Sequence, residues 1–161
     1  KYYAFSLKGE GVTAAFYALD THAMVYDENA LKKQLEWLDK ELSGCKAAWK
    51  VVFSHYPVYS YGYHGETGVL VKKLAPLLEK HNVDLYLCGH DHHMQFIHKG
   101  KVRYLVCGTG STIRQPGRGP DVLFNTAQLG FAFFSVTADS FAFQLIATDH
   151  TVLFEQKIDK K

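Results

Sequence analysis

Residues 83–92 read VDLYLCGHDH, an apolar run that ends in a glycine and a pair of histidines. The run predicts a buried strand, and Gly89 allows a sharp turn where a side chain would clash. Alternate side chains of an extended segment leave on the same side, so we expect His90 and His92 to converge. Converging imidazoles are typical metal ligands. The stretch therefore predicts the carboxyl end of a sheet strand that carries a candidate metal site.

Length and composition indicate one globular domain. The 161 residues are 47% hydrophobic, 14% aromatic and 21% charged, which is enough for a real core. A net charge of +2 is too small to indicate nucleic-acid or membrane binding through a basic surface. No apolar run approaches the roughly 18 residues that a membrane span needs. Three scattered cysteines predict no disulfide framework.

The chain before residue 83 predicts alternating strands and helices. Leucines at helical spacing precede Gly44, and a second apolar stripe contains Pro76, which predicts a kink or two shorter helices. Residues 49–88 then form a strand, loop, helix and strand, which is a βαβ unit of plausible length. The expected elements are a β-hairpin of residues 2–7 and 12–19, a helix ending at residue 44, strand 49–53, helix 68–81 and strand 83–88.

The chain after the histidines predicts antiparallel strands. A hairpin is expected over residues 95–106, and a loop rich in glycine over 107–120. Further strands are expected at 131–136, 141–147 and 152–158. One compact α/β unit, with parallel strands early and antiparallel strands late, fits this order.

A third histidine follows another strand end. His55 comes just after the strand that ends at Phe53. The carboxyl ends of neighbouring parallel strands share one rim, so we expect His55 to lie near His90 and His92. Three imidazoles suit zinc, iron or manganese better than calcium or magnesium. The alternative is that they are polar loop residues that never meet.

The remaining histidines are assigned by their neighbours. His64 lies in an aromatic, glycine-rich loop nine positions after His55, where it could serve as an acid–base group or simply lie on the surface. We expect His22 to be structural, and His93 to lie behind the ligands or on the surface. The nucleophile elbow G-x-S-x-G and the phosphate-binding P-loop are both absent from the sequence.

Taken together, three blocks of sequence resemble a known family. SHYPVYS (residues 54–60), HG (64–65) and LCGHDH (87–92) are similar to the C-terminal motifs of the calcineurin-like metallophosphoesterases. The likeness is greatest to the tartrate-resistant (purple) acid phosphatases of the small, mammalian type. The G-H-x-H block is shared across that superfamily, whereas H-Y-P-V with its trailing H-G is specific to the acid phosphatases. Further counterparts are residues 18–21, 34–38 and 74–78.

The resemblance implies a fold, an activity and a set of roles. The fold would be α/β (α+β), the C-terminal half of a four-layer αββα sandwich with a mixed sheet. The intact protein would be a metal-dependent acid phosphatase that hydrolyses phosphate monoesters. His55 and His90 would bind a divalent ion (Fe²⁺, Zn²⁺ or Mn²⁺), His92 would bind Fe³⁺, and His64 would hold the phosphate and protonate the leaving oxygen. Two cations about 3.5–4 Å apart would clamp the phosphate and activate a water.

The chain lacks several sequence motifs that the family carries upstream of the matched region. The upstream motifs D-x-G, G-D-x-x-Y and G-N-H-D/E do not occur in it. In the family they supply the bridging aspartate, the tyrosine that gives the purple colour, and further ligands. We therefore expect residues 1–161 to be the C-terminal part of one domain. Its partners would be a phosphate-ester substrate and the missing N-terminal half.

Two other functions stay open. Another member of the superfamily would act on phosphodiesters or nucleotide pyrophosphates, a choice that loop 107–126 and the tyrosines at 59, 61 and 63 would shape. A non-catalytic scaffold or anchoring protein would keep the fold without the chemistry, although the intact histidines argue against decay of the site. The compartment is unknown; the resemblance alone suggests a secreted, lysosomal or other endomembrane location.

Overall fold

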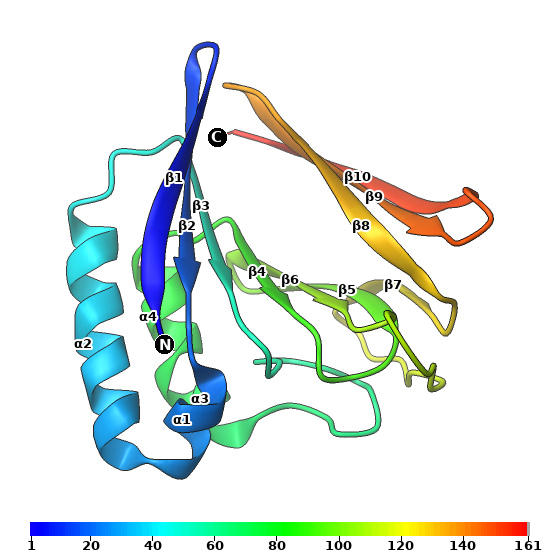
Figure 1. Ribbon diagram of the computed structural model, residues 1–161, viewed down its shortest axis with the longest axis horizontal. Helices are drawn as coiled ribbons and strands as arrows, with labels where there is room; N and C mark the ends of the chain where they lie inside the picture. The colour runs from blue at the N-terminus through cyan, green and yellow to red at the C-terminus, as the bar shows by residue number, and fades with distance from the viewer. Residues whose placement is uncertain (161) are drawn as a thin grey trace.

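The computed structural model describes residues 1–160, which form two β-sheets and one layer of helices (Figure 1). The larger sheet has seven strands in the order β1-β2-β3-β4-β6-β5-β7, and the smaller has three in the order β10-β9-β8. The helices cover one face of the larger sheet, and the smaller sheet faces its other side. This mixed α/β architecture confirms the fold class expected from the sequence.

The elements follow one another in nearly the expected order. The strands are β1 Tyr3–Gly9, β2 Val12–Ala18, β3 Trp49–Phe53, β4 Leu85–Cys88, β5 Met94–Lys99, β6 Val102–Cys107, β7 Val122–Thr126, β8 Gly130–Val136, β9 Ser140–Ala147 and β10 Val152–Asp159. The helices are α1 Thr21–Tyr26, α2 Glu28–Ser43, α3 Gly68–Lys73 and α4 Ala75–Lys80. Within residues 1–160, no helix combines the length and the apolar character that a membrane crossing needs.

The centre of the larger sheet is parallel. Strands β2, β3, β4 and β6 pair in parallel, whereas β1, β5 and β7 pair antiparallel. Val51, Val52, Leu85 and Tyr86 are fully buried, as expected for strands covered on both faces. The predicted βαβ unit is confirmed, since β3 and β4 lie side by side in parallel.

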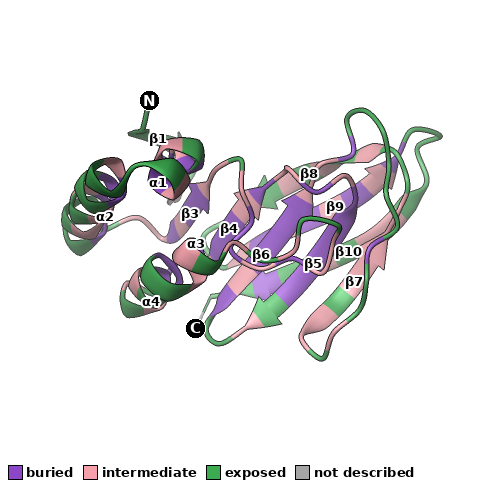
Figure 2. Cartoon of the chain, turned by 90° about the horizontal axis from the view of Figure 1, so that it is seen from below, coloured by how far each residue is buried: buried purple, intermediate pink, exposed green. Residues whose placement is uncertain are grey.

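Two hydrophobic cores hold the layers together (Figure 2). The core beneath the helices contains Leu38, Leu70 and Leu78. The core between the sheets contains Trp49 and Phe143. The expected break at Pro76 is confirmed, because α3 ends at Lys73 and proline occupies the first turn of α4, where its missing N–H does no harm.

Two elements were not expected from the sequence. Helix α1 has only six residues, and its N-cap is Asp20, whose side chain accepts from Ala23 N at 3.1 Å. Strand β7 pairs with β5 inside what the sequence presents as a loop. Both are short elements that depend on tertiary contacts, and neither is long enough to show a clear period.

Trp49 links the two sheets and allows a test of this packing. Its side chain is fully buried, and Nε1 donates to the Thr137 carbonyl at 2.8 Å. Trp49→Phe is expected to lower the free energy of unfolding by about 1–3 kcal/mol, because the carbonyl loses its partner. Denaturant unfolding of the whole protein measures this. Phe133→Leu, at an exposed position on β8, is the control, and equal stability of the two variants would contradict the packing role.

Candidate metal centre

The carboxyl ends of β3 and β4 form the rim on which the candidate site lies. His55 follows β3, and His90 follows β4. His90 Nδ1 and His55 Nε2 are 3.1 Å apart, and the ring centroids are 4.9 Å apart. The structure therefore brings these two histidines together, as the βαβ unit predicts. Their role as metal ligands stays a prediction.

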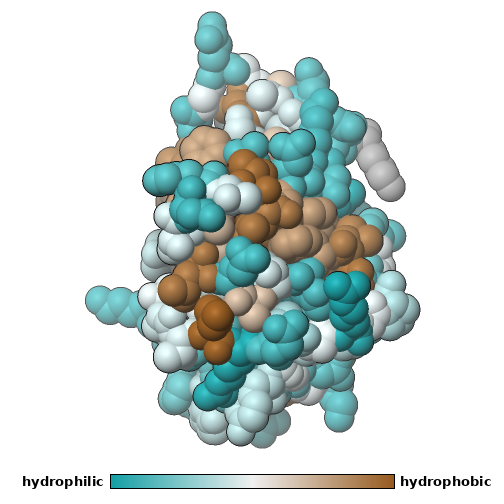
Figure 3. All heavy atoms as spheres, turned by 90° about the vertical axis from the view of Figure 1, so that its right-hand side faces the viewer, coloured by the Kyte–Doolittle hydropathy of each residue, from teal (hydrophilic) through white to brown (hydrophobic). Residues whose placement is uncertain are grey.

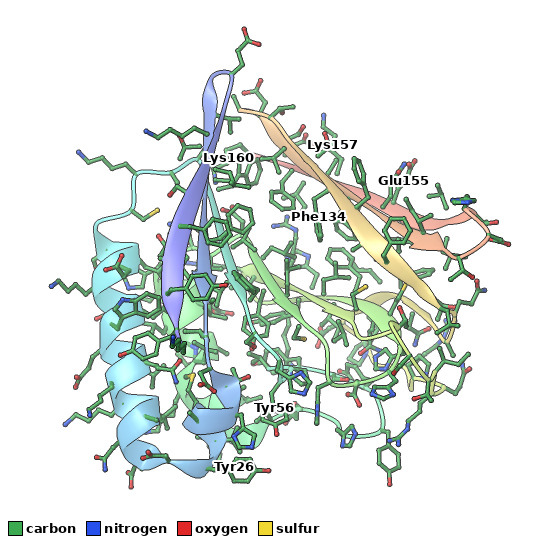
Figure 4. The ribbon with its side chains drawn as sticks, viewed as in Figure 1. Tyr26, Tyr56, Phe134, Glu155, Lys157 and Lys160 are labelled. Atoms are coloured by element: carbon green, nitrogen blue, oxygen red, sulfur yellow. The ribbon has the colours of Figure 1, made fainter. Side chains whose placement is uncertain are left out.

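Hydrogen bonds from three elements hold the His55 loop. Tyr56 N–H donates to Thr21 Oγ1 of α1 at 2.9 Å, and Tyr86 of β4 donates its hydroxyl to Tyr56 O at 2.7 Å. Gly89 N–H donates to His55 O at 3.2 Å, which joins the two rim loops directly. Burial raises the pKa of Tyr86, so its hydroxyl stays a neutral donor. Figure 4 shows Tyr56 beside Tyr26 at this end of the molecule.

The backbone at His90 differs from the expectation. Its φ is 66°, which is left-handed and uncommon for a residue other than glycine. The segment is therefore a tight bend, and the alternation of an extended strand is the wrong basis for pairing His90 with His92. His92 Nδ1 lies 2.7 Å from Thr112 Oγ1, and Arg114 N–H donates to His92 O at 2.8 Å, while the His92 side chain is still close enough to His90 to interact with it electrostatically. His92 thus lies against the loop that follows β6.

His64 lies over the rim beside His90. The two ring centroids are 4.2 Å apart, and the His64 side chain is exposed. The loop that carries His64 is anchored, because His64 N–H donates to Asp91 Oδ1 at 2.9 Å. Tyr63 and Arg114 continue the same surface, with Arg114 Cζ 4.3 Å from the centre of the Tyr63 ring. The rim therefore offers an imidazole and a guanidinium to solvent.

The charge state of His90 suits metal binding. Its pKa is lowered, first by burial and then by the neighbouring His64 and His55. A lowered pKa keeps more of the imidazole neutral, and the neutral form is the one that binds metals.

The His55–His90 pair fits two ligands of one ion. Nitrogens that each lie about 2.1 Å from a shared ion, at an angle near 90°, are about 3 Å apart. Imidazole ligands suit zinc, iron and manganese. Across residues 1–160, however, no three side chains of histidine, cysteine, aspartate or glutamate lie together as a metal site. Within the described residues the pair alone is therefore not a complete metal site.

The structure adds residues that the sequence did not single out. Asp91 is 1% exposed, and its side chain accepts a hydrogen bond from the His64 loop. Arg114 reaches the rim because β6, which precedes its loop, pairs with β4. The sequence feature that could have identified Arg114 is a basic residue in a glycine-rich loop that follows a strand next to β4.

Two other histidines lie apart from the pair. His93 is fully buried, and His22 packs on Tyr26 and Tyr56.

Comparison with known sequences identifies relatives. The sequence model of the family "Calcineurin-like phosphoesterase" matches residues 7–94. Tartrate-resistant acid phosphatase type 5 of Oryctolagus cuniculus is 37% identical over 122 residues, which cover 66% of this chain and 38% of that protein. Purple acid phosphatase 7 of Arabidopsis thaliana is 45% identical over 75 residues, covering 46% and 23% respectively. The chain thus spans well under half the length of these curated relatives.

Comparison with solved structures shows the same fold. The GAP50 anchor in the inner membrane complex of Plasmodium covers the chain completely with a TM-score of 0.90 and 25% identity, and the match spans 54% of that protein. A purple acid phosphatase from yellow lupin seeds covers 97% of the chain with a TM-score of 0.79 and 17% identity, and the match spans 32% of that protein.

Proposed function

The chain belongs to the calcineurin-like phosphoesterase family, and on this premise we propose that the intact protein hydrolyses phosphate monoesters. The observation that supports this most is the approach of His55 and His90 to 3.1 Å on one rim, with the His64 ring 4.2 Å from that of His90. In this proposal the two imidazoles are the metal ligands and the exposed His64 beside them is the acid–base group. The acid phosphatases among the relatives point to the same chemistry.

Family membership implies a dinuclear metal centre, to which this chain contributes histidines. We assign His55 and His90 to a divalent ion (Fe²⁺, Zn²⁺ or Mn²⁺), and His92 to Fe³⁺. The metals, when bound, neutralise the phosphoryl oxygens and lower the pKa of a bound water. His92 is oriented for its role by Thr112, which contacts Nδ1 and leaves Nε2 to bind.

His64 supplies the proton in this proposal. An acid placed near the leaving oxygen removes the need to expel a bare alkoxide. The exposed imidazole lies against His90, so it borders any phosphate ester that is bound at the rim. Arg114, over Tyr63 on the same surface, adds a positive charge that favours an anionic substrate.

We propose that an N-terminal part of the domain completes the site with carboxylates. Edge strand β1 exposes Tyr3, Phe5 and Leu7. A groove of about 400 Å³ opens between the sheets and is lined by Phe5, Phe16 and Phe134 among others; Figure 4 shows Phe134 between the two sheets. Apolar side chains also gather on the face of the three-stranded sheet (Figure 3). Exposed apolar surface of this extent favours a covering partner.

The domain proposal gives a prediction for residues 1–161 produced alone. They are expected to bind fewer than two metals tightly and to release phosphate far more slowly than the whole protein, because the bridging carboxylate is missing. Metal analysis and a phosphatase assay measure both. Two tightly bound metals with full turnover would overturn the division of the site.

A non-catalytic anchor is the second candidate. It is favoured by the TM-score of 0.90 over the whole chain with a structure described as an anchor. His55, His64, His90 and His92 remain in this chain, and an anchor has no need of them.

Hydrolysis of two model esters tests the proposal. The whole protein is assayed at acidic pH with p-nitrophenyl phosphate and with bis(p-nitrophenyl) phosphate. Faster hydrolysis of the monoester supports the proposal. Faster hydrolysis of the diester would indicate a phosphodiesterase instead. Failure to hydrolyse either ester would favour the non-catalytic anchor.

A further inference from the structure

A single buried carboxylate lies under the loop that carries His64. The Asp91 side chain is 1% exposed, between His90 and His92 in the sequence. Its Oδ1 accepts from His64 N–H at 2.9 Å, and its Oδ2 accepts from the Ser60 hydroxyl. The two oxygens therefore hold both ends of loop 60–64.

The middle of the loop is also packed directly on this carboxylate. Gly62 N–H donates to Ser60 Oγ at 2.9 Å. A Cβ atom on Gly62 would lie 2.5 Å from Asp91 Cγ and 2.3 Å from His93 Cε1. Only glycine allows so close an approach. The loop therefore lies against Asp91 at Ser60, Gly62 and His64.

Asp91 is itself fixed by its backbone. Asp91 N–H donates to Gly89 O at 2.8 Å, and its carbonyl accepts from His93 N–H at 2.9 Å. On the other side, a Cβ on Gly108 would lie 2.2 Å from Asp91 O. The carboxylate therefore cannot shift far without moving His90, its neighbour in sequence.

We propose that Asp91 is a positioning residue that sets the place of His64 relative to the ligand His90. This inference rests on the proposed phosphatase function. A buried carboxylate is costly unless it is hydrogen-bonded, and here both oxygens are matched by donors from one loop. A displacement of about 1 Å at a reacting group can lower a rate by about 100-fold. Asp91 would thus act on turnover through His64 without contacting substrate.

A double-mutant cycle in the whole protein tests this. Asp91→Ala is expected to lower kcat by about 10- to 100-fold with metal content unchanged. Asp91→Asn keeps one acceptor oxygen and is expected to restore part of the loss. In a His64→Ala background, Asp91→Ala should lower kcat no further, because its effect passes through His64. An equal loss in both backgrounds, or loss of metal, would overturn the proposal. If Asp91→Ala does not fold, Asp91→Asn is tested in the same cycle.

Hydrogen–deuterium exchange provides a readout that is independent of activity. In Asp91→Ala the His64 amide is expected to exchange faster, because it has lost its acceptor. Asp149→Ala, which removes an exposed carboxylate that accepts from Thr151 N–H, is the matched control. Unchanged exchange at His64 would overturn the proposal whether or not the protein is a phosphatase. If the wild-type protein has no phosphatase activity and the His64 amide still exchanges faster in Asp91→Ala, the anchoring of His64 is supported and the proposed function is overturned.

Discussion

Replacing His92 by alanine is expected to release iron from the metal centre proposed for the whole protein, and to abolish the visible absorption band that an iron–tyrosinate centre of this family would give. Turnover should fall by more than about 100-fold. Removing a residue that only hydrogen-bonds to a metal ligand costs up to about 100-fold, and removing the ligand itself should cost more. The physical reason is the loss of an imidazole whose ring is held by Thr112 at 2.7 Å. Metal analysis and the visible spectrum of the purified variant measure the effect.

The control for this variant is another histidine far from the rim. His150 is exposed, with a φ of 70°, in the turn before β10. His150→Asn suits this left-handed backbone and is expected to leave iron, colour and turnover unchanged. A His92→Ala protein that keeps its iron and its band would show that His92 is not a ligand.

Replacing His64 by alanine is expected to give the opposite combination. Turnover should fall by about 10²- to 10⁴-fold, the usual contribution of a general acid, while both metals stay bound. Steady-state kinetics and metal analysis on the same preparation separate the two effects. The prediction follows from the position of His64, exposed above the rim and hydrogen-bonded through its backbone to Asp91.

A second ring near the site serves as its control. His22 packs on Tyr26 and Tyr56, and His22→Phe keeps these ring contacts, so turnover should be unchanged. Loss of metal in His64→Ala would mean that His64 is a ligand, and full turnover would mean that the proton comes from another group.

The sequence was sufficient for the sheet and for one half of the candidate site. Fully buried parallel strands are nearly continuous apolar runs, and β3 and β4 are such runs. Their parallel pairing follows from the helical segments between them, and it places His55 beside His90. Pro76 marked the break between α3 and α4 because its chemistry is local.

What the sequence did not show depends on contacts between distant segments. Helix α1 and strand β7 are short, and each contacts a distant segment: Asp20, the N-cap of α1, exchanges backbone hydrogen bonds with the Gln34 side chain of α2, and β7 pairs with β5. The left-handed backbone of His90 removed the alternation on which its pairing with His92 was based. The sequence did not single out Asp91, because its hydrogen-bond partners, Ser60 and His64, are 31 and 27 positions away.

Measuring the metal content of the whole protein is the direct test of a dinuclear centre built on this rim. Atomic mass spectrometry is expected to find two metal ions per molecule, one of them iron, and fewer when His55, His90 and His92 are replaced together by alanine. A purified, folded protein without bound metal, or one whose metal content is unaffected by the triple substitution, would contradict it.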